Sequence, residues 1–287
     1  MTEQTSRTAV AGGTSTTVDQ PADGARPSAS EAGGEPRRGG LSVWAPSVMP
    51  DLGVEMTDEQ ALAATFRVLD GEGFAENMAG HITWQRPGQT NMLVNPWGLW
   101  WAELAASDIC EVDEDANVVA GRWDVTPAVH IHTELHRVRS DARVVIHNHP
   151  YHVSLLAALG HLPDLVHQTG SLFLDDVCWV EEYAGEIDSP RLAADLAATI
   201  GDASVAILRN HGVIVTGETL AQATYRAASI DRVCRMTYDV LVSGREPLQM
   251  NAAAMVGMKE SLLERAADVY WAGAVRAVLR ADPTVLS

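Results

Sequence analysis

The sequence VVIHNHP at residues 144–150 decides the fold prediction. Its three β-branched apolar residues predict a buried strand, and Pro150 ends that strand because it has no N–H for the ladder. Side chains alternate along a strand, so His147 and His149 are expected on the same side of it. Two imidazoles about 6 to 7 Å apart on one face can bind one metal ion.

A second apolar strand is also followed directly by a histidine, in AILRNHG at residues 206–212. Gly212 permits a sharp turn and a close approach of the backbone. His211 would complete a site of three nitrogen ligands, which leaves coordination positions for water or substrate, as in catalytic sites. Each motif by itself also fits hydrogen-bonded structural histidines. The order of the two motifs and their positions at strand ends favour a metal site.

Caps, glycines and apolar patterns predict the other elements. Thr57 and Gln60 have the spacing of a capping box, which begins a helix that ends near Gly71 or Gly73. Further strands are expected at residues 80–84, 92–95, 110–112, 118–120, 205–208 and 213–215. Further helices are expected at residues 129–137, 151–159, 190–200, 219–243 and 254–280. Strands and helices in this irregular order indicate one α/β/α domain.

Residues 1–40 differ in composition from the rest of the chain. They are rich in Gly, Ser, Thr, Ala and Pro and contain almost no large apolar side chains. Such a segment cannot bury enough surface to offset the entropy lost on ordering, so we expect a disordered N-terminal tail. We assign residues 41–287, including the C-terminal helices, to the folded domain.

The overall charge and the cysteine count exclude some classes of protein. The formal net charge is −18, from 38 acidic and 20 basic side chains, and an acidic surface argues against nucleic acid as a partner. The three cysteines are far apart and form no C-x-x-C pair, which predicts a reduced, cytoplasmic protein. No signal peptide is expected, and no stretch approaches the roughly 20 apolar residues of a membrane span.

The two histidine motifs together resemble those of a known family. VVIHNHP followed downstream by ILRNHGV is similar to the class II aldolase/adducin family, and MAGHI at residues 78–82 and NPWG at residues 95–98 add to the resemblance. The resemblance implies a single three-layer α/β/α domain with a mostly antiparallel central sheet. It also implies one divalent metal ion per chain, Zn²⁺, Fe²⁺ or Mn²⁺, bound by His147, His149 and His211.

The family also suggests how the chain is assembled. Many members are fourfold homotetramers with sites between subunits, so we expect a homotetramer that acts on a small-molecule substrate. Adducin belongs to the same family and has no metal site. The presence of all three histidines in this chain argues against a scaffold role of that kind.

The chain departs from the sugar-phosphate aldolases of the family at the acid/base position. Those aldolases have a P-S-S-E segment upstream of the H-x-H motif, and its glutamate binds the metal and moves a proton. Ala128 occupies that position here, in VTPAVH at residues 125–130. Alanine cannot move a proton, and Glu134 is out of register. The resemblance therefore does not imply that this chain performs the proton transfer of the aldol reaction.

The phosphate pocket is also altered. The positions that match the phosphate-binding segments of the aldolases are His81, Trp97, Thr126 and Pro127. Phosphate needs several converging N–H and O–H donors, so we infer a non-phosphorylated substrate. Trp97, Trp100 and Trp101 would provide flat apolar walls for an aromatic or prenylated molecule. The alternative is that these tryptophans pack in the core or between subunits.

Further residues are candidates for the site. His81 and His130 are candidate proton carriers or carboxylate-binding groups. Gly98, Thr126, His167 and Gln168 are candidates for substrate binding. The resemblance implies that Tyr270, on the last helix, reaches a neighbouring subunit's site, and core packing is its alternative role. His132 and His136 are spaced i and i+4 on an expected helix, so a separate zinc pair is a further alternative.

Three functions follow. The first is a metal-dependent lyase, a decarboxylase of a non-phosphorylated oxo or hydroxy acid, because loss of CO₂ needs no base at the start. The second is a non-heme Fe²⁺ oxygenase. It is suggested because NPWG, WDVTPAVHIHTELH and HQTGS resemble an actinobacterial subgroup that includes the novobiocin- and clorobiocin-pathway enzymes. The third is a non-catalytic scaffold that binds no metal.

Overall fold

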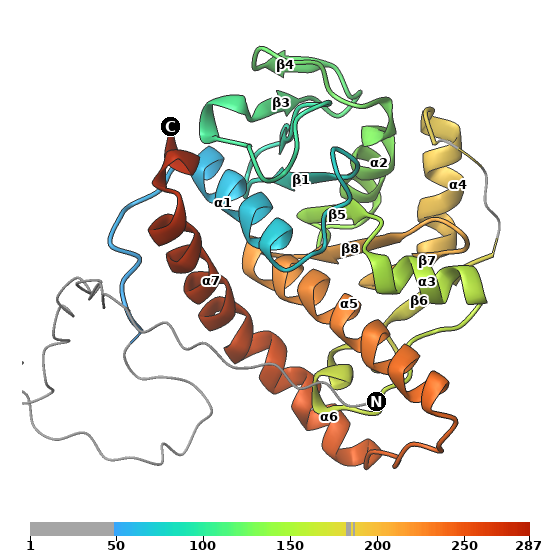
Figure 1. Ribbon diagram of the computed structural model, residues 1–287. Coiled ribbons are helices and arrows are strands. Elements are labelled where there is room, and N and C mark those ends of the chain that lie inside the picture. The colour runs from blue at the N-terminus through green and yellow to red at the C-terminus, as the bar shows by residue number, and fades with distance from the viewer. Residues whose placement is uncertain (1–48, 182–184, 186) are drawn as a thin grey trace, which may run out of the picture. The chain divides into compact units, whose positions relative to one another are not determined.

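The computed structural model describes residues 49–181, 185 and 187–287 (Figure 1). The predicted tail at residues 1–40 lies outside the described residues. No helix in the described part of the chain is both long and apolar enough to cross a bilayer.

The helices and strands lie close to the predicted positions. The helices are α1 (Asp58–Gly71), α2 (His130–Val138), α3 (Tyr151–Leu159), α4 (Pro190–Ile200), α5 (Leu220–Ser243), α6 (Ala252–Ser261) and α7 (Ala267–Ala281). The strands are β1 (His81–Gln85), β2 (Met92–Val94), β3 (Cys110–Val112), β4 (Val118–Ala120), β5 (Val144–Asn148), β6 (Val177–Val180), β7 (Val205–Leu208) and β8 (Val213–Gly217).

The sequence located the start of one helix correctly and missed an interruption in another helical region. The capping box of Thr57 and Gln60 is present, and it begins α1 as predicted. The helix expected at residues 254–280 is instead α6 and α7 joined by a π-helical turn, Leu262–Ala266. Such a turn inserts one residue into the helical hydrogen-bond pattern without ending the helix.

The described strands form one eight-stranded sheet in the order β4-β3-β2-β1-β5-β8-β7-β6. Every neighbouring pair is antiparallel except β6 and β7, which are parallel. The predicted mostly antiparallel sheet is therefore confirmed. Strand β6 was not predicted. It is only four residues long and partly exposed at the sheet edge, so no long buried run marks it.

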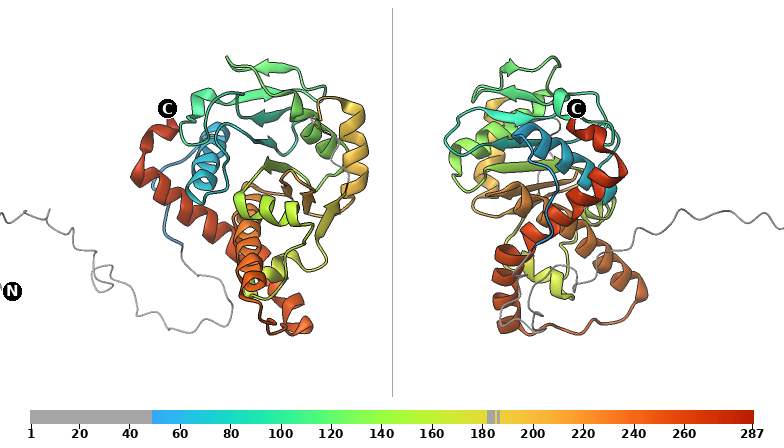
Figure 2. Two further views of the ribbon diagram at one scale, coloured as in Figure 1. Left: turned by 45° about the vertical axis from the view of Figure 1, so that its right-hand side comes forward. Right: turned by 90° about the vertical axis from the view of Figure 1, so that its left-hand side faces the viewer.

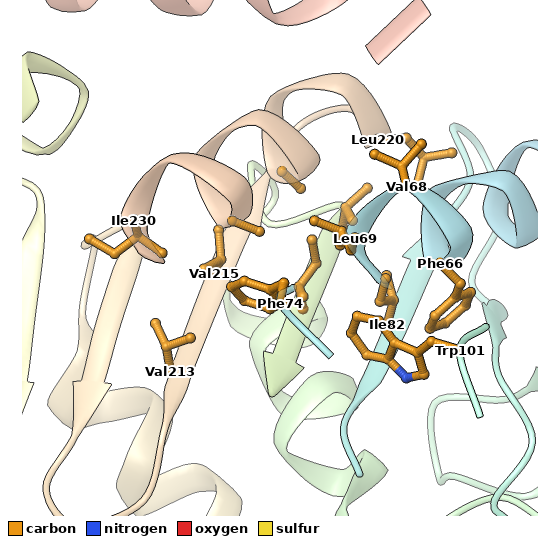
Figure 3. Close-up of a cluster of buried hydrophobic side chains, with 14 of the residues drawn as sticks. Phe66, Val68, Leu69, Phe74, Ile82, Trp101, Val213, Val215, Leu220 and Ile230 are labelled. Atoms are coloured by element: carbon orange, nitrogen blue, oxygen red, sulfur yellow. The ribbon is translucent and has the colours of Figure 1, made fainter. Parts of the chain in front are cut away.

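Helices cover both faces of the sheet, which confirms the three-layer α/β/α fold (Figures 1 and 2). Residues of α1, α3, α5 and α7 form the larger core with alternate strand residues such as Ile82 and Val215. Figure 3 shows the part of this core to which α1, α5 and the sheet contribute. Helices α2 and α4 pack on the opposite face, against Val145 and Ala206.

Trp101 belongs to the larger core, so its predicted role as a pocket wall is wrong. Its side chain is fully buried, and its ring lies 4.9 Å from that of Phe66 in an edge-to-face arrangement (Figure 3). The indole packs against Phe66 and Phe74 in the core, so it cannot contact a substrate. Trp97 and Trp100, in contrast, are exposed.

The pairing of β1 with β5 places polar residues beneath α2. His81 pairs with His147 and Thr83 pairs with Val145 across the two strands. Val145 packs with α2, and side chains two residues apart point to the same face. The register therefore puts His147, His81 and Thr83 on the face that α2 covers.

Candidate metal centre

Three histidine side chains converge at the end of β5. His147 lies in β5, His149 directly follows that strand, and His211 lies in the turn between β7 and β8. The ring centroids are 5.1 Å apart for His147 and His149, 4.9 Å for His147 and His211, and 4.7 Å for His149 and His211. One nitrogen of each ring lies within 4.8 Å of the others. This spacing suits one metal ion with three imidazole ligands.

A close backbone approach brings His211 to the other two rings. A Cβ added at Gly212 would lie 2.4 Å from the carbonyl oxygen of Asn148 and 2.7 Å from Cδ2 of His149. Only glycine fits between these atoms. Gly212 thus allows the turn after β7 to pack against the end of β5, as its position in the sequence motif predicted.

Hydrogen bonds fix the tautomers of two of the rings. Nδ1 of His147 lies 3.0 Å from the carbonyl oxygen of Val213, and Nδ1 of His149 lies 2.6 Å from Oε2 of Glu76. Both oxygens accept, so Nδ1 carries the proton in each neutral ring and Nε2 is left unprotonated. Nε2 of His149 is buried and has no hydrogen-bond partner among the described residues. An unprotonated imidazole nitrogen of this kind fits a divalent metal.

Glu76 is a member of the site that the sequence did not reveal. Oδ1 of Asn148 accepts hydrogen bonds from the backbone N–H groups of Glu76 and His149, at 3.2 and 2.6 Å. Nδ2 of Asn148 donates to the carbonyl oxygen of Ala79 at 3.1 Å. Asn148 therefore ties the loop before β1 to β5 and holds the Glu76 carboxylate beside His149. No local motif signals this contact, because 73 residues separate the two partners.

Burial keeps two of the three convergent histidines neutral. Desolvation, followed by the charges of neighbouring histidines, lowers the pKa of His147 well below its ordinary value. Desolvation, followed by the charge of His149, lowers the pKa of His211 to about 4, although Glu76 acts in the opposite direction. Neutral imidazole is the form that binds a metal, so no proton has to be displaced from these two rings near pH 7.

A cavity of about 710 Å³ opens onto the three histidines. Several residues predicted for the site line it: His81, Trp97, Thr126, Pro127 and Ala128. Ile131 and Asp188 also line the cavity and were not predicted. The wall is therefore mixed, with an exposed indole, an imidazole and few small hydroxyl donors.

Other predicted site residues lie away from this cavity wall. Gly98 and His130 are not among its lining residues, although they are neighbours of Trp97 and Ile131, which are. His167 precedes a short 3₁₀ helix, Gln168–Phe173, that packs against α5 and α6, and its ring accepts a hydrogen bond from the Thr169 N–H. Neither His167 nor Gln168 contributes to the cavity within this chain.

Tyr270 also lies away from the cavity of its own chain. It is in α7, and its ring centroid lies 5.1 Å from that of Tyr225 in α5. Burial, followed by the charge of Glu72, raises the pKa of Tyr270. A role of Tyr270 in a neighbouring subunit's site stays a prediction.

A chain of hydrogen bonds runs from His81 into the layer beneath α2. Nδ1 of His81 lies 2.7 Å from Nε2 of His132, Nδ1 of His132 lies 2.8 Å from Oγ1 of Thr83, and the same oxygen lies 2.7 Å from Nε2 of His136. His132 and His136 thus use these nitrogens to bond to His81 and Thr83, so the alternative of a separate zinc pair is wrong.

Burial also keeps this chain of histidines neutral. Desolvation is the largest cause in each case. It lowers the pKa of His81 to about 3, that of His136 to about 4 and that of His132 well below its ordinary value. Each ring therefore has one donor and one acceptor nitrogen near neutral pH.

Residues 60–238 match the family model described as the Class II Aldolase and Adducin N-terminal domain. The chain belongs to this family. It is 32% identical over 189 residues to the adducin-related protein C1289.14 of Schizosaccharomyces pombe, a match that covers 60% of this chain and 56% of that protein. The chain thus spans little more than half of that relative's length.

Two bacterial class II relatives carry enzyme names. The 3,4-dihydroxyphthalate decarboxylase of Arthrobacter keyseri is 32% identical over 204 residues, covering 64% of this chain and 79% of that enzyme. The second relative is the 4-hydroxy-3-prenylphenylpyruvate oxygenase/4-hydroxy-3-prenylbenzoate synthase of Streptomyces roseochromogenus. It is 28% identical over 189 residues, and the match covers 64% of this chain and 68% of that enzyme.

Solved structures agree on the fold of this class II chain. The aldolase II superfamily protein of Pseudomonas syringae superposes with a TM-score of 0.71 at 24% identity, over 79% of this chain and 94% of that one. At this level of identity the likeness shows the fold alone.

Proposed function

We propose that the chain is a metal-dependent lyase that cleaves a carbon–carbon bond, by decarboxylation of a non-phosphorylated aromatic oxo or hydroxy acid. The observation that carries this proposal is the composition of the cavity. Three histidines converge on it, and its wall holds Ala128 and Trp97. The sugar-phosphate aldolases have a proton-carrying glutamate and phosphate-binding donors at these positions.

The metal-binding residues of the proposed enzyme are His147, His149 and His211. A divalent metal bound there would act as a Lewis acid and stabilise negative charge on a substrate oxygen. Glu76 and the Val213 carbonyl hold His149 and His147 in the tautomers that leave Nε2 for the metal. Such outer contacts fix the ring orientation and raise the basicity of the ligand.

The other cavity residues bind and orient the substrate in this proposal. Trp97 is 60% exposed and provides a flat apolar surface for an aromatic ring. His81 contacts the polar groups of the substrate. Ala128 cannot donate the proton that replaces the lost carboxyl group, so water that enters the cavity supplies it. The 3,4-dihydroxyphthalate decarboxylase supports this reading, because its name describes loss of CO₂ from an aromatic hydroxy acid.

A non-heme Fe²⁺ oxygenase is the second candidate. It is supported by the similarity to the 4-hydroxy-3-prenylphenylpyruvate oxygenase. Three neutral imidazoles can bind iron, although two histidines and a carboxylate are the commoner set for Fe²⁺ oxygenases. The similarity to the adducin-related protein supports a third candidate, a scaffold without metal, which the three convergent histidines argue against.

One experiment separates the three candidates. The chain, purified without oxygen, is loaded separately with Zn²⁺, Mn²⁺ and Fe²⁺ and offered aromatic 2-oxo acids and ortho-hydroxybenzoic acids. We expect release of CO₂ without uptake of O₂, and its loss in His211→Ala. O₂ uptake that depends on both substrate and iron would favour the oxygenase. Absence of metal binding on reconstitution would contradict both enzymatic proposals.

A further inference from the structure

The cavity at the three convergent histidines has one residue with a carboxylate, Asp188, among its described lining residues. No lysine, arginine or glutamate is among those lining residues. An ionised carboxylate offers only acceptor oxygens, so it attracts groups that donate a hydrogen bond and repels other anions. Asp188 is therefore the described residue of the wall that can discriminate ligands by their charge.

The residues on either side of Asp188 hold it in place. The side chain of Ile187 is buried, with 9% exposure, in the core that α2 and α4 form on their face of the sheet. Ser189 occupies the N-cap position of α4, and Pro190 is the first residue of that helix. Ile187 and Ile131 of α2 also line the cavity. Asp188 thus adjoins an apolar part of the wall.

Asp188 differs from the other carboxylates near the histidines in its contacts. Glu76 bonds to the ring of His149, and Asp231 bonds to both the backbone and the ring of His152. These two carboxylates hold parts of the chain together. Asp188 is exposed, and it forms no side-chain hydrogen bond or ion pair with any other residue in the described part of the chain. Within that part its carboxylate is available to a ligand.

The charges in the wall would orient an aromatic acid. Imidazole binds metals in its neutral form, so a divalent ion held by His147, His149 and His211 keeps its full positive charge. Asp188 adds a negative charge to the same cavity. The carboxylate of a bound acid is attracted to the metal and repelled by Asp188. A donor group elsewhere on the ring is then the part of the molecule that Asp188 can bind.

We propose that Asp188 is a specificity-determining residue whose carboxylate accepts a hydrogen bond from a hydroxyl or amino group on the ring of the aromatic acid. This inference rests on the proposed function and narrows its substrate class. The substrate carries a donor group on its ring, apart from the carboxylate that the metal attracts. A second carboxylate in place of that donor is disfavoured, because two anionic groups would meet there.

Binding of simple aromatic acids to the Zn²⁺-loaded full chain tests this inference without turnover. The probes 2,4-dihydroxybenzoate and 2,5-dihydroxybenzoate are salicylates with one further hydroxyl group. Their counterparts, 2-hydroxy-4-methoxybenzoate and 2-hydroxy-5-methoxybenzoate, keep the added oxygen and lack its proton. In at least one pair we expect the hydroxyl compound to bind about 5-fold more tightly in calorimetric titrations. Equal affinities in both pairs, or no binding of any probe, would overturn the inference.

A matched pair of variants separates the hydrogen bond from the larger size of the methoxy group. Asp188→Ala removes the acceptor. Asp195→Ala is the control, because Asp195 is an exposed aspartate of α4 that does not line the cavity. Each variant removes one negative charge. We expect the preference for the hydroxyl compound to fall to about twofold or less in Asp188→Ala and to be kept in Asp195→Ala. An unchanged preference in Asp188→Ala overturns the inference.

Probes with a second carboxylate test the charge of Asp188. In 2-hydroxyterephthalate and 4-hydroxyisophthalate a carboxylate replaces the added hydroxyl of the two dihydroxybenzoates. We expect at least one of them to bind about 3- to 5-fold more tightly in Asp188→Asn than in the wild type, and neither to do so in Asp195→Asn. No gain in Asp188→Asn contradicts the inference.

The failure of this inference can be distinguished from that of the proposed function. If the chain shows the expected preferences but releases no CO₂ from any acid, the proposed function fails and the role of Asp188 in binding stands. If the chain releases CO₂ but Asp188→Ala keeps the wild-type preference, the proposed function stands and this inference fails.

Discussion

His147 and His132 are both buried histidines on the same face of the sheet, and burial lowers the pKa of both. They differ in the partners of their ring nitrogens. His147 bonds to a backbone carbonyl through Nδ1 and lies in the cluster with His149 and His211. His132 bonds to side chains through both nitrogens. Burial and a low pKa therefore do not identify a candidate metal ligand, whereas the convergence of one nitrogen from each of three imidazoles does.

Substitutions in the two regions should affect different properties, metal binding in one and stability in the other. We call His147, His149 and His211 the metal triad, and His81, His132, Thr83 and His136 the histidine chain. Variants of the metal triad should weaken metal binding with little loss of stability. Variants of the histidine chain should lower stability and leave metal binding nearly unchanged.

The largest effect is expected for His211→Ala. Loss of one of three ligands should weaken the affinity for Zn²⁺ by roughly 100-fold or more, beyond the effect expected for an outer contact. His161→Ala is the matched control, because His161 bonds only to the neighbouring Leu162 carbonyl oxygen among the described residues. Competition with a chromogenic chelator measures both affinities. Equal affinities in the two variants would remove His211 from the site.

Glu76→Ala should have the next largest effect. It removes the carboxylate that holds His149, and loss of such an outer contact costs about 10- to 100-fold in metal affinity. Glu76→Gln keeps an acceptor oxygen near Nδ1 of His149 and should lose less of the metal affinity. If both variants bind Zn²⁺ like the wild type, Glu76 does not orient His149, and the 2.6 Å contact has no role in the site.

Thr83→Val should lower the free energy of unfolding by about 1 to 3 kcal/mol, because it leaves buried imidazole nitrogens without their partner. Urea denaturation of the metal-free chain measures this change, and Thr83→Ser is the control. Zn²⁺ affinity should change by less than about threefold. A loss of affinity as large as that of His211→Ala would mean that the two regions are not separate.

The smallest effect at any one pH step concerns the dependence of stability on pH. The native pKa of His136 is about 4, below its ordinary value of 6.5, so between these values the unfolded chain binds a proton that the folded chain does not. Stability is therefore lost as the pH falls from about 6.5 to 4, by about 1.4 kcal/mol per pH unit for each such histidine. His136→Gln should reduce this slope by about one proton in urea denaturation of the metal-free chain. An unchanged slope would mean that His136 is already protonated in the folded state.

The convergence of the three histidines could be predicted from the sequence, because each lies in or next to a strand whose apolar pattern is local. The fold was predictable for the same reason, apart from the short edge strand β6. Glu76 and the histidine chain were not, since their contacts join residues 73 and 51 positions apart. Those contacts depend on the register of β1 against β5, which neither strand shows by itself. For Trp101 the sequence left two roles open, core and pocket wall, because a tryptophan suits both, and the structure confirms the core.

The most direct test of the central claim is X-ray absorption at the zinc edge of the Zn²⁺-reconstituted full chain. The account predicts one zinc ion per chain with three imidazole nitrogens at about 2.0 to 2.1 Å, and two imidazoles in His211→Ala. A wild-type spectrum with fewer than three imidazoles, or one that His211→Ala leaves unchanged, would contradict it.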